Sequence, residues 1–266
     1  MSYYQIIIFK ILLKIYKIFS IIFKIPNPIV ARKILISKEI YEKQKGRVAC
    51  GFFEDMVIPN NMSWGVADQA AMLLGMYEKE VQDILFSAPS QCTRLIDLGA
   101  ADGYYAVGTT LKGKFEEAIC YEIDSGRRKI IKENALSNGV NDKIVIHGAA
   151  KKNFLDNFID KDISNYFLLI DIEGAEFDIL NIDNLEKLKE AHVLVEIHDH
   201  RIDDGHLAYE KLINNSNKFF NVQKIYNGAR NPFENPLLND FSHDDGWLIA
   251  SEGRKRNGHW LYLTPK

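Results

Sequence analysis

The sequence predicts an α/β fold in which helices cover both faces of a doubly wound, mostly parallel sheet. The first observation is that apolar segments of strand length alternate with amphipathic helical segments through the middle of the chain, a pattern typical of βαβ units. The second is a glycine-containing turn directly after the first of these apolar segments, because doubly wound sheets bind their ligands at such turns. The third is a pair of late strand-like segments, which can add an antiparallel edge.

Five strands are expected in the middle of the chain, with helices between them. Two more strands are expected at 222–228 and 259–265, and the Asn- and Pro-rich stretch 227–246 is expected to form a long loop over a site. The central strands are expected at 93–99, 116–124, 143–150, 165–173 and 192–200, and the helices at 104–113, 126–139, 184–191 and 207–215.

Residues 1–28 form an apolar segment in which the polar residues follow a helical pattern. On a helix, four lysines and one serine fall within about a third of the circumference. This pattern predicts a basic amphipathic helix whose residues 1–25 lie on an anionic membrane surface, or else pack on the domain or on a second copy of the chain. The recurring charges argue against a spanning helix and a signal peptide. The polar residues are Lys10, Lys14, Lys17, Ser20 and Lys24, and Pro26 and Pro28 are expected to end the helix.

The remaining 238 residues are long enough to bury a sizeable core. Residues 29–88 are expected to form an N-terminal helical cap, with a short helix near 38–46 and a longer one that Ser63 or Asp68 caps. Residues 89–266 are expected to form the ligand-binding domain.

Composition excludes several classes of protein. The net charge of -3 and the pI of about 6.2 give no basic surface for nucleic acid. Cys50, Cys92 and Cys120 are widely spaced and odd in number, which fits neither a disulfide framework nor a zinc site. We therefore expect core thiols in a cytoplasmic, reducing environment.

The turn after the first strand, LIDLGAADGYYAVG, carries the signal for a nucleoside. Gly99 and Gly103 let the backbone turn tightly and approach a ligand. Glu122 follows at the end of the second strand, where a carboxylate can bind both ribose hydroxyls. The turn lacks both G-x-G-x-x-G and the P-loop motif. Because Asp97 suits a cationic group better than a diphosphate, S-adenosylmethionine, which carries a sulfonium and an ammonium group, fits best.

The motifs LIDLGAADGYYAVG, CYEIDSG, LLIDIEGAEFDIL and LVEIHDH, in this order, resemble the FkbM family of S-adenosylmethionine-dependent methyltransferases. The resemblance covers about residues 60–200, and its most distinctive part is D-x-E-G-A-E at 171–176. It implies the seven-stranded, Rossmann-like class I methyltransferase sheet, and O-methylation, often of sugars.

The resemblance also implies roles for individual residues. It places the first-strand turn around the methionine end of the cofactor, the acid of the second strand at the ribose, and the end of the third strand at the adenine. The turn departs from the family pattern at Asp102, which we expect to face the cofactor's amino group. The expected cofactor-binding residues are Asp97, Gly99, Ala101, Asp102, Gly103, Glu122, Ile123, Ala149 and Asp171.

Carboxylates and one histidine gather where the fourth and fifth strands end. A hydroxyl acceptor must lose its proton, which a general base or a divalent cation can assist. We expect His198 to be the base, with Asp171 and Glu196 as catalytic partners; the same three residues are candidate ligands for Mg²⁺ or Mn²⁺. Glu173 is a further candidate for the chemistry. Two other acids are expected to serve the fold, Glu176 in a first helical turn and Asp178 on a solvated face.

The sequence predicts a methyltransferase that acts on a hydroxyl of a polysaccharide or glycolipid precursor at the cytoplasmic membrane face. A small natural product or a lipid is the alternative acceptor. A membrane scaffold that binds a nucleoside without chemistry is an alternative of another class, and an NAD-dependent oxidoreductase is the most remote. Trp64, Tyr77 and Glu78 either close over the cofactor or pack in helices, and Arg230, Asn231 and Asp244 are candidates for acceptor binding.

Overall fold

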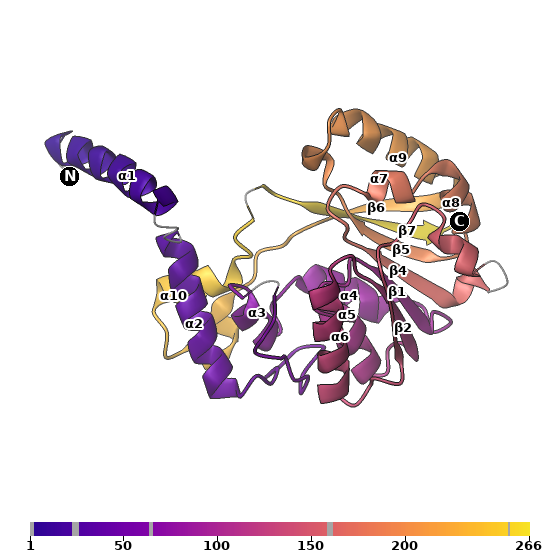
Figure 1. Cartoon of the computed structure of the whole chain (residues 1–266), viewed down its shortest axis with the longest axis horizontal. Helices are drawn as coiled ribbons and strands as arrows, with labels where there is room; N and C mark the ends of the chain where they lie inside the picture. The colour runs from indigo at the N-terminus through magenta and orange to yellow at the C-terminus, as the bar shows by residue number, and fades with distance from the viewer. Residues whose placement is uncertain (1–2, 23–26, 64–65, 159–161, 255) are drawn as a thin grey trace.

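The computed structural model describes residues 3–22, 27–63, 66–158, 162–254 and 256–266. Its centre is a seven-stranded sheet in the order β3-β2-β1-β4-β5-β7-β6 (Figure 1). The first five strands are parallel, and β7 is antiparallel to both of its neighbours. This confirms the predicted fold class, including the antiparallel edge. The strands are β1 (Arg94–Leu98), β2 (Glu117–Tyr121), β3 (Ile144–His147), β4 (Tyr166–Ile170), β5 (His192–Glu196), β6 (Phe220–Tyr226) and β7 (His259–Pro265).

Helices cover the two faces of the sheet in two groups (Figure 1). Alternating side chains of the strands pack into separate hydrophobic clusters, so that Leu168 faces one cluster and Leu169 the other. The central strands are buried along almost their whole length because both faces are covered. One group of helices is α4 (Lys79–Ser87), α5 (Tyr104–Leu111) and α6 (Ser125–Ser137), and the other is α7 (Glu176–Ile179), α8 (Ile182–Lys187) and α9 (Gly205–Phe219).

The strands that carry the predicted site end earlier than the sequence suggested. β4 ends at Ile170 and β5 at Glu196, so Asp171 and His198 lie in the loops that follow. The regular alternation of side chains along a strand therefore does not extend through these residues, and the backbone of the loops decides where they point.

The N-terminal part differs from the predicted cap. The helix expected near residues 38–46 is much longer, since α2 spans Pro28–Gln44 and begins with Pro28 after the capping side chain of Asn27. The longer helix expected in the cap is broken into α3 (Gln69–Leu73) and α4. The break contains Gly75, at which a Cβ would lie 2.3 Å from the carbonyl oxygen of Cys50.

The stretch 227–246, expected as a long loop, is partly helical. It contains two short 3₁₀ turns and the start of α10 (His243–Ala250). α10 packs against α2 (Figure 1), and Arg32 of α2 forms an ion pair of 2.6 Å with Asp245. Ile36, Leu73 and Ile249 belong to one hydrophobic cluster. The segment expected as a cap thus shares its core with the C-terminal part of the chain.

Helix α1 (Tyr3–Ile22) stands away from the rest of the molecule (Figure 1). The break predicted at Pro26 lies outside the described residues, and Pro28 is the first residue of α2. Many of the apolar side chains of α1 are exposed. Among the residues that the structure describes, no helix is long and apolar enough to cross a membrane.

Candidate active site

The turn after β1 is built around glycines with positive φ. Gly99 has φ 88° and Gly103 has φ 82°, a region that glycine adopts without steric cost. A Cβ at residue 99 would lie 1.8 Å from the carbonyl oxygen of Asp171. Only glycine therefore lets the turn pass this close to the end of β4. The peptide N–H of Gly99 donates to the carbonyl of Tyr121 at 2.8 Å, which fixes the turn to β2.

Glu122 lies at the end of β2, where the sequence placed the ribose-binding acid. Its side chain is buried. Oε2 accepts a hydrogen bond from the N–H of Ala101 at 2.9 Å, and Oε1 accepts one from the N–H of Asp124 at 2.8 Å. Each carboxylate oxygen retains a lone pair for a ligand hydroxyl. Ile123, which follows, is 78% exposed, and Ala149 is exposed beyond β3.

Asp97 provides a buried carboxylate with unused hydrogen-bonding capacity. Its Oδ2 is buried and has no hydrogen-bond partner within the described part of the chain. Burial, and then the charge of Glu122, raise the pKa of Asp97 to about 7. An orphaned buried acid of this kind fits a cationic group such as the ammonium of S-adenosylmethionine.

Asp102 contacts the N-terminal segment of the chain. Its carboxylate accepts hydrogen bonds from the N–H and the hydroxyl of Ser63, at 2.8 and 2.9 Å. These bonds tie the N-terminal segment to the turn. Asp102 also lines a hollow beside Asp97, and its expected place at the cofactor's amino group stays a prediction. Ser63 accordingly contacts Asp102 and does not cap a helix. Trp64 lies outside the described residues.

The structure brings His198 together with the acids that end β4 and β5. Its Nε2 lies 3.7 Å from Oδ1 of Asp171, 3.4 Å from Oε2 of Glu173 and 3.6 Å from Oε2 of Glu196. We call Asp171, Glu173, Glu196 and His198 the His198 cluster. Burial raises the pKa of Asp171 well above its usual range. The charges of nearby carboxylates, Glu196 first, raise the pKa further.

Glu176 contacts this cluster through the backbone of His198. It is fully buried. Its Oε1 accepts a hydrogen bond from the backbone N–H of His198 at 2.7 Å, and its Oε2 accepts one from Gly174 at 2.7 Å. Burial alone would raise the pKa of Glu176, but hydrogen bonds involving His198 outweigh it and lower the pKa. Asp178 is exposed and pairs with Lys152 at 2.9 Å, as expected for a solvated face.

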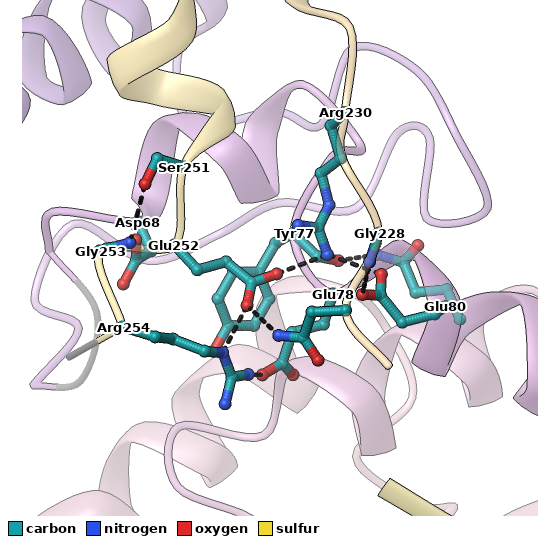
Figure 2. Close-up of polar contacts among 12 residues, drawn as sticks. Asp68, Tyr77, Glu78, Glu80, Gly228, Arg230, Ser251, Glu252, Gly253 and Arg254 are labelled. Atoms are coloured by element: carbon teal, nitrogen blue, oxygen red, sulfur yellow. Dashed lines mark hydrogen bonds and ion pairs between the residues drawn. The ribbon is translucent and has the colours of Figure 1, made fainter. Parts of the chain in front are cut away.

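Arg254 is the residue of this site that sequence reasoning missed. Its guanidinium pairs with Glu78 and Glu252 (Figure 2). It also pairs with Glu196. Glu78 thereby joins the site, held also by the hydroxyl of Tyr105. Arg254 and Glu78 are 176 residues apart in the chain, and the basic stretch around Arg254 reads as a solvated loop, so no local pattern signals the contact.

Arg230 belongs to the same network and is not available for an acceptor. Its guanidinium pairs with Glu80 at 2.6 Å and with Glu252 (Figure 2). The side chain is almost completely buried. The role expected for Arg230, binding of acceptor hydroxyls, is therefore replaced by an ion pair that ties the C-terminal segment to α4.

Two hollows meet at this site. A narrow one of about 40 Å³ lies between the turn after β1, Asp97 and Tyr77, and a cleft of about 640 Å³ contains the His198 cluster and Arg254. Tyr77, Glu78 and Asp171 line both. The narrow hollow is smaller than a nucleoside site, so side chains on its wall must move when a ligand enters. A larger hollow of about 1120 Å³, lined by residues such as Arg47 and Leu237, contains none of these groups.

The strand order, the antiparallel β7 and the glycine turn after β1 define a class I, S-adenosylmethionine-dependent methyltransferase fold. Comparison with protein families agrees, because residues 78–222 match the family model described as Methyltransferase FkbM domain. The match spans more than half of the chain. The chain therefore belongs to the FkbM methyltransferase family, and S-adenosylmethionine is its cofactor.

Several solved structures resemble this chain at low identity. The B. subtilis M1A22 tRNA methyltransferase TrmK is 12% identical, with a TM-score of 0.47 over 71% of this chain and 66% of its own. The precorrin-6y C5,15-methyltransferase of Geobacter metallireducens is 13% identical, with a TM-score of 0.46 over 71% and 90%. M. capricolum TrmK in complex with S-adenosyl-homocysteine is 11% identical, with a TM-score of 0.46 over 72% and 70%. No curated protein matches the sequence.

Proposed function

We propose that this chain is an O-methyltransferase that transfers a methyl group to a hydroxyl of a carbohydrate. The observation that carries the proposal is the position of Asp171, which lines both the hollow at the glycine turn and the cleft with His198. An acceptor in the cleft would thus meet the cofactor's pocket at Asp171. The cleft is rich in carboxylates and imidazoles, which are suitable hydrogen-bond partners for an acceptor with many hydroxyls.

On this proposal, residues of the first two strands hold the cofactor. When bound, S-adenosylmethionine supplies a methyl group on a sulfonium, which is a good leaving group. Asp97 pairs with the ammonium, Glu122 accepts hydrogen bonds from the ribose, and the exposed side chain of Ile123 covers apolar surface of the nucleoside. These contacts orient the methyl group toward the cleft and reduce the entropy lost on the way to the transition state.

The His198 cluster would then act on the acceptor. A sugar hydroxyl has a pKa far above 7 and needs help to lose its proton. The cluster offers two devices, the imidazole of His198 as a general base and a set of oxygen and nitrogen ligands for a cation. Glu176 and Arg254 keep the cluster in place through His198 and Glu196.

The test is methyl transfer by the full chain to a panel of mono- and oligosaccharides and glycolipids. We expect S-adenosylhomocysteine to form only with a carbohydrate present, and mass spectrometry to locate a methyl ether. D97N should lose the activity, whereas D178N, an exposed acid two residues past Glu176, should retain it. Transfer only to lipids or small natural products would overturn the carbohydrate proposal. Cofactor binding without transfer to any class of acceptor would favour the scaffold.

We also propose that α1 brings the enzyme to an anionic membrane surface. Ile8, Phe9 and Leu12 are more than half exposed, and Lys10 and Lys14 are exposed on the same helix, which contains no acidic residue. Apolar side chains that enter the headgroup layer and lysines that pair with anionic lipids are the two components of interfacial binding. An acceptor with a lipid anchor would be met there.

A further inference from the structure

We propose that Asp171, Glu196 and His198 form a binding site for a divalent cation. Asp171 Oδ1, Glu196 Oε2 and His198 Nε2 belong to one group whose candidate ligand atoms lie within 4.8 Å of one another. Atoms at such separations can share one ion after a small contraction. The site deepens the proposed function, and its chemical role rests on that function.

His198 gives an independent indication of a ligand. Only 9% of its side chain is exposed, yet Nε2 points into the cluster, at 3.4 Å or more from each of the three carboxylates. These distances are at or beyond the limit of a hydrogen bond. Within this cluster, Nδ1 of His198 and Oδ1 of Asp171 are buried and have no hydrogen-bond partner among the described residues. Buried polar atoms without a partner, in a cluster of acids, point to a bound ion.

The surroundings of His198 match those of a metal ligand. A metal-binding histidine usually presents its other ring nitrogen to a carboxylate, which fixes the ring. Nδ1 of His198 lies 3.5 Å from Oε1 of Glu176, and Glu176 is itself held by the backbone N–H groups of His198 and Gly174. That separation is too long for a good hydrogen bond, so Glu176 positions His198 through its backbone N–H. Nε2 then faces Glu173, Glu196 and Asp171.

The two carboxylate ligands are oriented as well. Arg254 binds Oε1 of Glu196 and leaves Oε2 facing His198. Arg201 binds Glu173 at 2.6 Å on the exposed side of the cluster. Among the described residues, neither arginine forms an ion pair with Asp171.

The balance of charge favours a cation. Asp171, Glu173, Glu176, Glu196 and Glu78 converge here, and the ion pairs that the described residues give them with arginine are those of Arg201 and Arg254. Close like charges in a poorly solvated place repel strongly. A divalent cation between Asp171 and Glu196 relieves that repulsion.

Two carboxylates and one imidazole suit Mg²⁺ or Mn²⁺, and the imidazole favours Mn²⁺ of the two. Three protein ligands leave coordination positions open toward the cleft, where a bound cation lowers the pKa of a hydroxyl. His198 is then a ligand, in place of the general base expected from the sequence. Glu173, 37% exposed at the edge of the cluster, is the carboxylate left to receive the proton and release it to solvent.

The test uses Mn²⁺ alone with the full chain, first stripped with EDTA, and follows binding by calorimetry and electron paramagnetic resonance. We expect one saturable site per chain. D171N, E196Q and H198A should each weaken binding at least tenfold, and E176Q should weaken it by about tenfold to a hundredfold through loss of the orienting carboxylate. D178N is the matched control and should bind like the unmodified chain. Circular dichroism confirms that each variant is folded.

Two results would overturn the site: no saturable binding of Mn²⁺, or binding that D171N and H198A leave unchanged. The outcome is separable from that of the proposed function. Carbohydrate methylation that persists in EDTA would remove the cation from the reaction while the acceptor proposal stands. Conversely, Mn²⁺ held by these three residues in an enzyme that methylates only lipids would leave the site in place and overturn the carbohydrate acceptor.

Discussion

The carboxylate of Glu176 accepts a hydrogen bond from the backbone N–H of His198 at 2.7 Å, and the same oxygen lies 3.5 Å from the imidazole Nδ1. One buried acid thus holds the backbone of the central histidine and lies beside its ring. This contact also explains the density of acids in the stretch from Asp171 to Asp178. Asp171 and Glu173 face the cleft, Glu176 holds His198, and Asp178 lies on the surface.

Replacement of Glu176 is therefore expected to weaken the fold as well as the site. E176Q removes an ionised acceptor of two backbone hydrogen bonds, and the free energy of unfolding should fall by roughly 3 kcal/mol. Urea unfolding measures this loss. D178N, which alters an exposed ion pair, should stay within about 0.5 kcal/mol of the unmodified chain. An equal fall in the free energy of unfolding of both variants would show that the buried contact of Glu176 stabilises the fold no more than an exposed ion pair does.

Arg254 is expected to stabilise the site through its charge and its fork-like shape. R254M leaves Glu78 and Glu196 buried without their shared cation, so the free energy of unfolding should fall by roughly 3 kcal/mol. R254K retains the charge but cannot bind both acids in the same geometry. Its free energy of unfolding should therefore fall by less than that of R254M. K152Q, which removes the exposed partner of Asp178, is the control. Thermal and urea unfolding provide the comparison, and an R254M variant as stable as K152Q would contradict the expectation.

Local patterns were sufficient to predict the sheet and the residues at its strand ends. Apolar segments identify buried strands, and parallel strands bring their carboxyl ends to one edge, so Asp97, Glu122, Asp171 and Glu196 could be expected near one another. The same patterns did not predict at which residue each strand ends. His198 was expected on β5, but the strand stops at Glu196, and the position of His198 depends on Glu176.

Contacts between distant segments could not be predicted from one sequence. Arg254 reaches Glu78 and Glu196 only because α10 packs on α2 and returns the chain to the sheet. Hydrophobic packing of α10 decides that path, and no motif near Arg254 records it. The contact between Asp102 and Ser63, which are 39 residues apart, could not be predicted for the same reason.

The pKa of Asp97 predicts how cofactor binding changes with pH. Because the ionised form pairs with the ammonium and the pKa of Asp97 is about 7, affinity for S-adenosylmethionine should rise severalfold between about pH 6 and about pH 7.5, below the range in which the ligand's own α-ammonium loses its proton. D97N should bind weakly at every pH. Calorimetry at several pH values tests this, and a wild-type affinity independent of pH would exclude Asp97 as the cation's partner.

The same shift has the opposite effect on the stability of the ligand-free protein. The folded state holds the Asp97 proton more tightly than the unfolded chain, since burial raises the pKa from 3.8 to about 7. The free energy of unfolding should therefore fall as pH rises through this range. D97N, which carries no proton to lose, should show a smaller slope. Urea unfolding of both proteins across this range measures the difference.

Helix α1 is expected to bind membranes through lysines and apolar side chains together. Deletion of residues 1–25 should abolish sedimentation with phosphatidylglycerol vesicles and leave cofactor binding unchanged. Each lysine near an anionic surface contributes about 1 kcal/mol, so replacing both Lys10 and Lys14 with glutamine should weaken binding roughly thirtyfold. Vesicles of phosphatidylcholine alone should bind less, and added salt should release the full chain. A full chain that stays in solution at low salt, and forms a dimer that the deletion abolishes, would assign α1 to a second copy of the chain.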